Sequence, residues 1–117
     1  MRMKVAIDIL RRPEEVFPWI ADPDKAMRWQ ENVTGGQVLK ATPEKIGTTF
    51  REEMEEDGKS LVMTGEITGY VQNQSISFHL DSRIHKVDVT YLIEGNAQGC
   101  TFVGESTILW KLPLSLI

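Results

Sequence analysis

Most of this chain consists of short runs in which apolar and polar residues alternate, and the runs follow one another too closely to leave room for helices. After residue 32 these runs cover 37–40, 47–56, 59–69, 76–80, 87–93 and 102–110. Alternation with a period of two is typical of strands that bury one face. Parallel neighbours would need crossover connections of a dozen or more residues. The spacing therefore predicts an antiparallel meander.

The first thirty residues follow a different pattern. Residues 3–10 alternate as a strand and are broken by the Arg-Arg-Pro sequence at 11–13. Pro13 then suits the first turn of a short helix, because a proline there sacrifices no helical hydrogen bond. Asp22 and Pro23 have the residue types of an N-cap and a first helical position, which predicts a second short helix ending at Trp29. With the meander, this gives an α+β fold: seven antiparallel strands with two short helices after the first.

Composition limits the function classes. The length of 117 residues indicates one domain. The net charge of -4 gives the chain no positive field to attract nucleic acid or anionic lipid. It has no apolar stretch long enough to span a membrane. The single Cys100 cannot form an internal disulfide, which agrees with a reducing compartment, and we expect a cytoplasmic protein.

The sequence predicts neither a metal site nor a cofactor. His79, His85 and Cys100 are too few and too scattered for zinc ligation. The paired glycines at 35–36 lack the spacing and the following helix of a phosphate-binding loop.

Three residues are weak candidates for acid-base chemistry. Strict alternation places Glu52 on the face of Phe50 and Met54, where it would point inward if these two residues do. The same two orientations, inward or outward, are open for Glu66 on the return strand. A carboxylate that points into an apolar cavity would have a raised pKa and could anchor a ligand or move a proton. A shift of one residue in register would turn either side chain to water. His85 shares the phase of the apolar strand that follows it, and we interpret it as a structural histidine rather than a catalytic one.

Large aromatic residues and methionines are spread through the chain, where they either fill the core or line a cavity for an apolar ligand. Composition cannot separate the two roles. The candidate ligand-binding residues are Trp29, Phe50, Met63, Phe78, Tyr91 and Trp110.

The order of these elements resembles a known superfamily. The features that carry the likeness are the opening strand running into residues 12–23, then Trp29, the Ile-Gly-Thr sequence at 46–48 before an acidic hairpin, and Gly-Glu-Ile at 65–67. Together they resemble the START-related superfamily, also called SRPBCC, which includes the birch-pollen-allergen-like proteins and the polyketide cyclase/dehydrase and lipid-transport group. The likeness covers essentially the whole chain.

This resemblance implies a helix-grip fold. In that fold a curved antiparallel sheet wraps around a long C-terminal helix and leaves an apolar cavity between them. Only residues 112–117 remain for that helix here. Without that helix, we expect the concave face of the sheet, which includes Val87, Val89, Tyr91 and Trp110, to be exposed. We therefore expect either a chain that is truncated before the helix or a partner chain, such as a second copy in a homodimer, that covers the open sheet face.

The sequence thus favours a non-enzymatic protein that binds, and could transport, a small hydrophobic ligand such as a lipid or polyketide. A small cyclase or dehydratase that uses Glu52, Glu66 or His85 is the first alternative. A protein-interaction module like the co-chaperones of the superfamily is the second.

Overall fold

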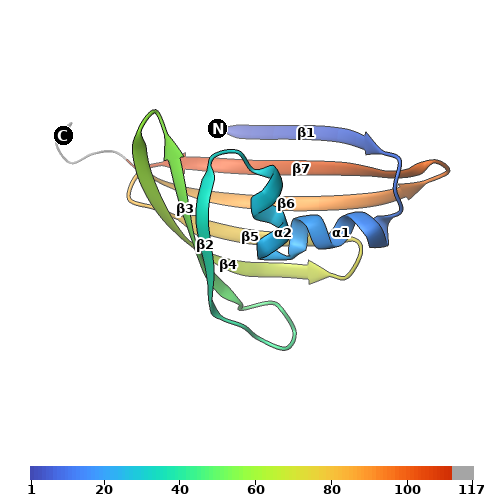
Figure 1. Ribbon diagram of the computed structural model, residues 1–117, viewed down its shortest axis with the longest axis horizontal. Helices are drawn as coiled ribbons and strands as arrows, with labels where there is room; N and C mark the ends of the chain where they lie inside the picture. Colours follow the sequence, from blue (N-terminus) through green and yellow to red (C-terminus); the bar gives the residue numbers. More distant parts are fainter. Residues whose placement is uncertain (112–117) are drawn as a thin grey trace.

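The computed structural model describes residues 1–111. They form a single curved sheet and two helices, shown in Figure 1. The elements in chain order are β1 (Arg2–Ile9), α1 (Pro13–Ala21), α2 (Pro23–Trp29), β2 (Val33–Lys40), β3 (Thr49–Glu56), β4 (Lys59–Val71), β5 (Ser75–Asp81), β6 (His85–Asn96) and β7 (Gly99–Trp110).

All neighbouring strands are antiparallel, and the sheet order is β1-β7-β6-β5-β4-β3-β2. The predicted meander is therefore confirmed, and β1 closes it by pairing with the last strand. The expected first turn of a C-terminal helix falls on residues 112–117, which lie outside the described residues. Between residues 1 and 111, no helix is long and apolar enough to cross a membrane.

The β3–β4 hairpin turns at Asp57 and Gly58. Both residues have positive φ, 53° and 75°. These angles are typical of the tight turn whose twist matches that of the flanking strands, and they explain why an Asp-Gly pair stands there. The sequence-based prediction of this hairpin is confirmed.

β2 begins four residues earlier than the sequence indicated. The prediction started at residue 37, whereas the strand starts at Val33 and includes Gly35 and Gly36. Glycines weaken the strand pattern. At Gly36, however, a Cβ atom would lie 3.1 Å from Sδ of Met27. The missing side chain lets α2 pack closely against β2.

The helices pack against one face of the sheet, which we call the concave face. In α1, Val16, Phe17 and Ile20 form a buried stripe. This stripe packs on sheet residues that include Ile67, Ile76, Ile93, Cys100 and Phe102. Each large apolar side chain buried in this way contributes about 1.5–3 kcal/mol. The stripe therefore fixes α1 to the middle of the sheet.

A second buried cluster lies away from the helices. It consists of Met63, Leu80, Val87 and Val89, with residues of β3 packed against it. If no helix covered the sheet, we expected Val87 and Val89 to be exposed. That expectation is wrong, because the strongly curved β3 folds over them and leaves 7% and 8% of each accessible.

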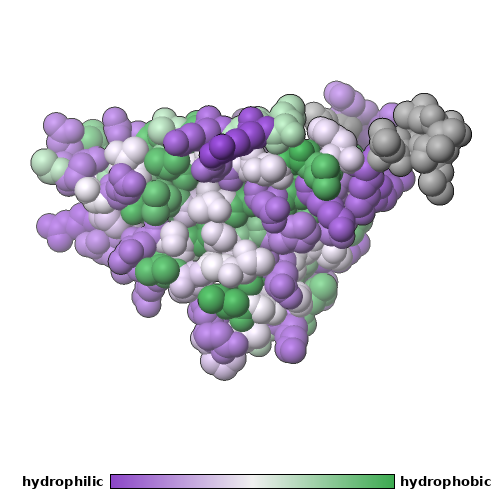
Figure 2. All heavy atoms as spheres, turned by 180° about the vertical axis from the view of Figure 1, so that it is seen from behind, coloured by the Kyte–Doolittle hydropathy of each residue, from purple (hydrophilic) through white to green (hydrophobic). Residues whose placement is uncertain are grey.

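Exposed apolar residues on the concave face concentrate along β1. Met3, Val5 and Ile7 are 55%, 51% and 51% exposed, and Trp110 at the end of β7 is 53% exposed. Seen from behind, the molecule shows mainly hydrophilic and intermediate side chains with scattered hydrophobic ones (Figure 2). The side of the concave face nearest β1 is therefore apolar and open.

Candidate functional site

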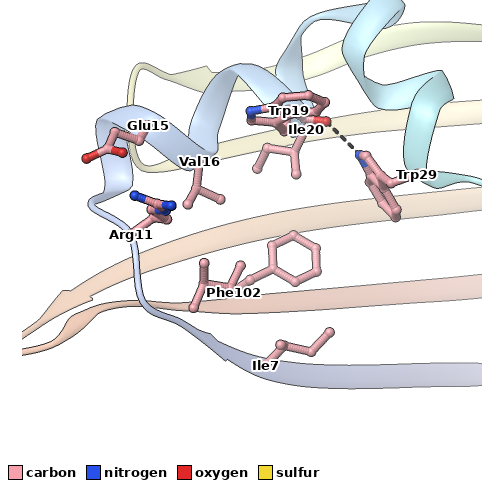
Figure 3. A pocket seen from close by; sticks show the side chains of 9 residues that line it. Ile7, Arg11, Glu15, Val16, Trp19, Ile20, Trp29 and Phe102 are labelled. Atoms are coloured by element: carbon pink, nitrogen blue, oxygen red, sulfur yellow. Dashed lines mark hydrogen bonds between the residues drawn. The ribbon is translucent and has the colours of Figure 1, made fainter.

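An apolar groove runs between α1 and the β1–β7 side of the sheet. Its volume is about 440 Å³. In Figure 3, Val16 and Ile20 of α1 point toward Phe102 of β7 and Ile7 of β1. The residues that line this groove are Ile7, Ile9, Arg11, Glu15, Val16, Trp19, Ile20, Trp29 and Phe102.

Two tryptophans form the helical side of the groove. The indole Nε1–H of Trp29 donates a hydrogen bond to the backbone oxygen of Trp19 over 2.7 Å (Figure 3). This bond joins the end of α2 to α1. Asp22 sets the direction of α2, because its Oδ1 accepts from the backbone N–H of Asp24 and so caps the helix.

A smaller hollow, which we call the inner cavity, lies deeper under α1 and α2. It measures about 60 Å³, and its walls include Phe50, Phe78 and Tyr91 from three strands. Ile20 lines both the groove and the inner cavity. Trp29 of the groove packs against Tyr91, with ring centroids 6.3 Å apart. The two spaces are therefore neighbours on one apolar face.

Aromatic rings continue from the inner cavity across the sheet. Phe50 and Phe78 meet edge to face with centroids 6.0 Å apart, and Phe78 and Tyr91 do the same at 5.5 Å. Tyr91 also contacts Phe102, whose ring lies 5.2 Å away. Edge-to-face contacts fix the ring positions. The walls of the site are therefore largely formed before any ligand arrives.

Glu52 is the one charged side chain among the described residues that line the inner cavity. Burial raises the pKa of its carboxyl group. Burial also raises the pKa of Tyr91 to about 12, and the negative charge of Glu52 adds to that shift. Of the two orientations that the sequence left open for Glu52, the structure has the inward one.

Glu66 does not share this position, so the inward orientation considered for it is wrong. It is exposed, whereas Met63, Gly65 and Ile67 on the same strand are buried. Glu66 and Tyr70 are four residues apart, so an unbroken strand would place them on the same face. A register irregularity between Ile67 and Gly69 breaks the alternation, so that Tyr70 turns to the concave face and Glu66 does not.

His85 is held in the turn between β5 and β6. Its Nδ1 lies 2.7 Å from Oγ of Ser82, and the same oxygen accepts the backbone N–H of His85 over 3.1 Å. Its ring packs on Trp110, with centroids 5.2 Å apart. These contacts stabilise the turn and give His85 a structural environment.

The six aromatic and methionine candidates lie in four different environments. Trp29 lines the groove, and Phe50, Phe78 and Tyr91 line the inner cavity. Met63 is buried in the second core cluster, and Trp110 is exposed beside His85. Neither of these two lines the groove or the inner cavity.

The sequence analysis missed much of the groove wall. Val16, Trp19 and Ile20 come from α1, and Ile7 and Ile9 come from β1. The apolar stripe of the first helix and the alternation of the first strand were the available signals.

A further hollow of about 550 Å³ is lined largely by polar and loop residues around Asn96. Another, of about 530 Å³, has mixed walls, with apolar residues such as Phe17, Val38 and Ile67 beside polar ones such as Asn73.

No group of three or more histidine, cysteine or acidic side chains within residues 1–111 is placed to hold a metal ion. The polar side chains that line the groove and the inner cavity carry carboxyl, guanidinium, hydroxyl and amide groups. With apolar walls around them, they can orient a ligand by hydrogen bonds.

Comparison with solved structures shows the same fold in distant proteins. A START superfamily protein from Mycobacterium smegmatis superposes with a TM-score of 0.83 at 16% identity, covering 97% of this chain and 79% of that one. Protein CV1439 from Chromobacterium violaceum gives 0.78 at 14% identity, covering 98% and 85%. Ara h 8.0201 gives 0.76 at 16% identity, covering 98% and 83%.

These likenesses establish the helix-grip type of sheet expected from the sequence. No curated protein matches the chain. A family model described as polyketide cyclase / dehydrase and lipid transport matches residues 1–113. The chain therefore belongs to the polyketide cyclase/dehydrase and lipid-transport family.

Proposed function

We propose that this protein binds a small hydrophobic ligand, such as a lipid or polyketide, in the groove between α1 and the β1–β7 side of the sheet. The observation that carries the proposal is the wall of the groove: seven of its nine residues are aliphatic or aromatic. Its volume of about 440 Å³ is within the range of small-molecule sites.

The family description supports the same proposal. It covers both enzymes and lipid carriers, and binding of an apolar molecule is common to the two. Fold alone does not determine function, so the proposal depends on the groove. The cytoplasm stays the expected compartment, because Cys100 is a free thiol buried in the core.

Binding of a neutral apolar dye such as Nile red, followed by fluorescence, tests the proposal. Ile7→Gln places an amide in the groove, and Val62→Gln is the matched control. Both residues are strand aliphatics of similar exposure, 51% and 43%, and Val62 lies outside the groove. We expect dye affinity to fall several-fold in Ile7→Gln and to stay unchanged in Val62→Gln. An equal effect of both substitutions would contradict the proposed groove.

Native mass spectrometry of protein purified without delipidation addresses the natural ligand. We expect a co-purified hydrophobic molecule that is absent from Ile7→Gln. Retention of the same molecule by that variant would place binding elsewhere.

The homodimer, one of the two alternatives that the sequence offers for the open sheet face, stays a prediction. The apolar residues exposed along β1 give it a surface to bury. Light scattering of the purified protein tests it, because a dimer doubles the mass and a monomer at high concentration would contradict it.

A further inference from the structure

The inner cavity has a polar end in otherwise apolar walls. Glu52 and Tyr91 lie there among side chains such as Phe50 and Phe78. Thr48 also lines the cavity, but its hydroxyl already accepts the backbone N–H of Thr42 over 3.1 Å. Gln30 adds a side-chain amide to the walls, so Glu52, Tyr91 and Gln30 supply the polar groups that remain available for a bound molecule.

The carboxylate of Glu52 has no cation beside it in the described part of the chain. Its neighbour Arg51 alternates to the other face of β3, where its Nη1 pairs with Oε1 of Glu53 over 2.5 Å. No buried side-chain oxygen within residues 1–111 lacks a hydrogen-bond partner. Since no hydrogen bond to Glu52 is formed there, its oxygens must retain accessible surface, which places them against the open space of the cavity.

We propose, on the basis of the proposed function, that the bound ligand presents a hydrogen-bond donor, a hydroxyl or a protonated amine, to Glu52 while its apolar body lies in the groove. The groove and the inner cavity are neighbours, because Ile20 lines both and Trp29 of the groove packs against Tyr91 of the inner cavity. The inner cavity, at about 60 Å³, has room for an end group rather than for a whole ligand.

The ionised carboxyl group of Glu52 determines which polar groups of a ligand can bind beside it. Such a group only accepts hydrogen bonds, and a half-desolvated one gains most from a donor. A ligand carboxylate would be repelled by Glu52, and an ether or ester oxygen would find an acceptor facing it. Aromatic rings around the site also favour a cationic donor, because ring faces attract positive charge.

Isothermal titration calorimetry of the full chain at neutral pH, with four naphthalenes substituted at one ring position, tests the inference. The probes are naphthol, aminomethylnaphthalene, methoxynaphthalene and acetylnaphthalene, which share an apolar body and differ in the polar group. We expect wild-type protein to bind naphthol and the amine about tenfold tighter than methoxynaphthalene.

Two variants show whether Glu52 causes this preference. Glu52→Met keeps a long side chain and removes the acceptor, so the affinities for naphthol and methoxynaphthalene should become equal. Glu66→Met is the matched control, because Glu66 is exposed outside both spaces, and it should retain the tenfold ratio. Circular dichroism confirms that both variants are folded.

The outcomes separate the inference from the function on which it rests. If methoxynaphthalene or acetylnaphthalene binds wild-type protein as tightly as naphthol and the amine do, the inference is wrong and apolar binding stands. A preference that survives in Glu52→Met also overturns it. If none of the four probes binds, the proposed function itself fails.

Discussion

Trp29 and Trp19 are joined by a hydrogen bond of 2.7 Å from the indole Nε1–H of the first to the backbone oxygen of the second. Both side chains line the groove and are about two-fifths exposed, at 44% and 42%. This bond holds the last turn of α2 against α1 on the open side of the molecule, where Nζ of Lys25 also lies 5.6 Å from the centroid of the Trp19 ring. The geometry of the groove depends on this contact.

Trp29→Phe removes the donor and keeps an aromatic ring. We expect it to lower the free energy of unfolding by about 1 kcal/mol, the usual net value of one hydrogen bond, and to weaken dye binding. Urea denaturation measures the first effect. Trp19→Phe is the control, because the acceptor is a backbone oxygen and the bond survives. Equal destabilisation by both variants would show that ring packing, not the bond, joins the helices.

Gly65 is required where β4 passes under the ring of Phe50. A Cβ atom at this position would lie 2.3 Å from Cζ of Phe50 and 2.9 Å from a methyl carbon of Leu80. We expect Gly65→Ala to cost about 1–3 kcal/mol of stability, as overpacked cores do, and to displace Phe50 in the inner cavity. Thermal denaturation checks this.

Gly35→Ala is the matched control for that substitution. Its Cβ would stay 3.5 Å from the nearest atom, which belongs to Glu53. Alanine normally stabilises a strand relative to glycine, so the control should be neutral or slightly stabilising. A neutral Gly65→Ala would contradict the close packing of Phe50.

Local patterns predicted the framework of this fold, because each strand and turn has its own signal. The hairpin at Asp57 and Gly58 and the cap at Asp22 follow from residue chemistry within a few positions. The start of β2 does not follow from local residue chemistry. Gly36 stands there because α2 packs closely against the strand, and glycine has no preference for strands. Contacts between distant segments leave no periodic trace in the sequence.

The same limit explains the outcome for the candidate site. Alternation groups Glu52 with Phe50 on one face of their strand, but it does not show whether that face points inward. It does not show which part of that face a helix covers. Met63 therefore proved to be core and Trp110 to be exposed, while Trp19 and Ile7 were missed as groove residues.

Glu52 should make the stability of the protein depend on pH in a direction opposite to that of most carboxyl groups. Burial raises its pKa in the folded state above the ordinary value of 4.5. The folded state therefore holds the proton more tightly, and stability is lost as pH rises through the window between these two values. We expect Glu52→Gln to stabilise the protein more at pH 7 than at pH 4.

Chemical denaturation at the two pH values measures this difference. The hydrogen bond from Lys111 lowers the pKa of Asp81, so the stabilisation by Asp81 is lost as pH falls. Subtracting the free energy of unfolding of the wild-type protein at each pH removes this contribution. Glu66→Gln is the control on the exposed face. A stabilisation by Glu52→Gln that is the same at both pH values would show that the carboxyl group is not desolvated.

Tyr91 provides an independent measure of the same environment. The chain has two tyrosines, so Tyr70→Phe leaves Tyr91 as the single phenol. Its absorbance on alkaline titration should change with a pKa of about 12, because burial and then the charge of Glu52 both disfavour the phenolate. Adding Glu52→Gln should lower that pKa while leaving it above 10.0, since burial is the larger cause. A midpoint at the ordinary tyrosine value in the folded protein would mean that water reaches the inner cavity freely. An unchanged midpoint in Glu52→Gln would show that the charge of Glu52 does not act on the Tyr91 phenol.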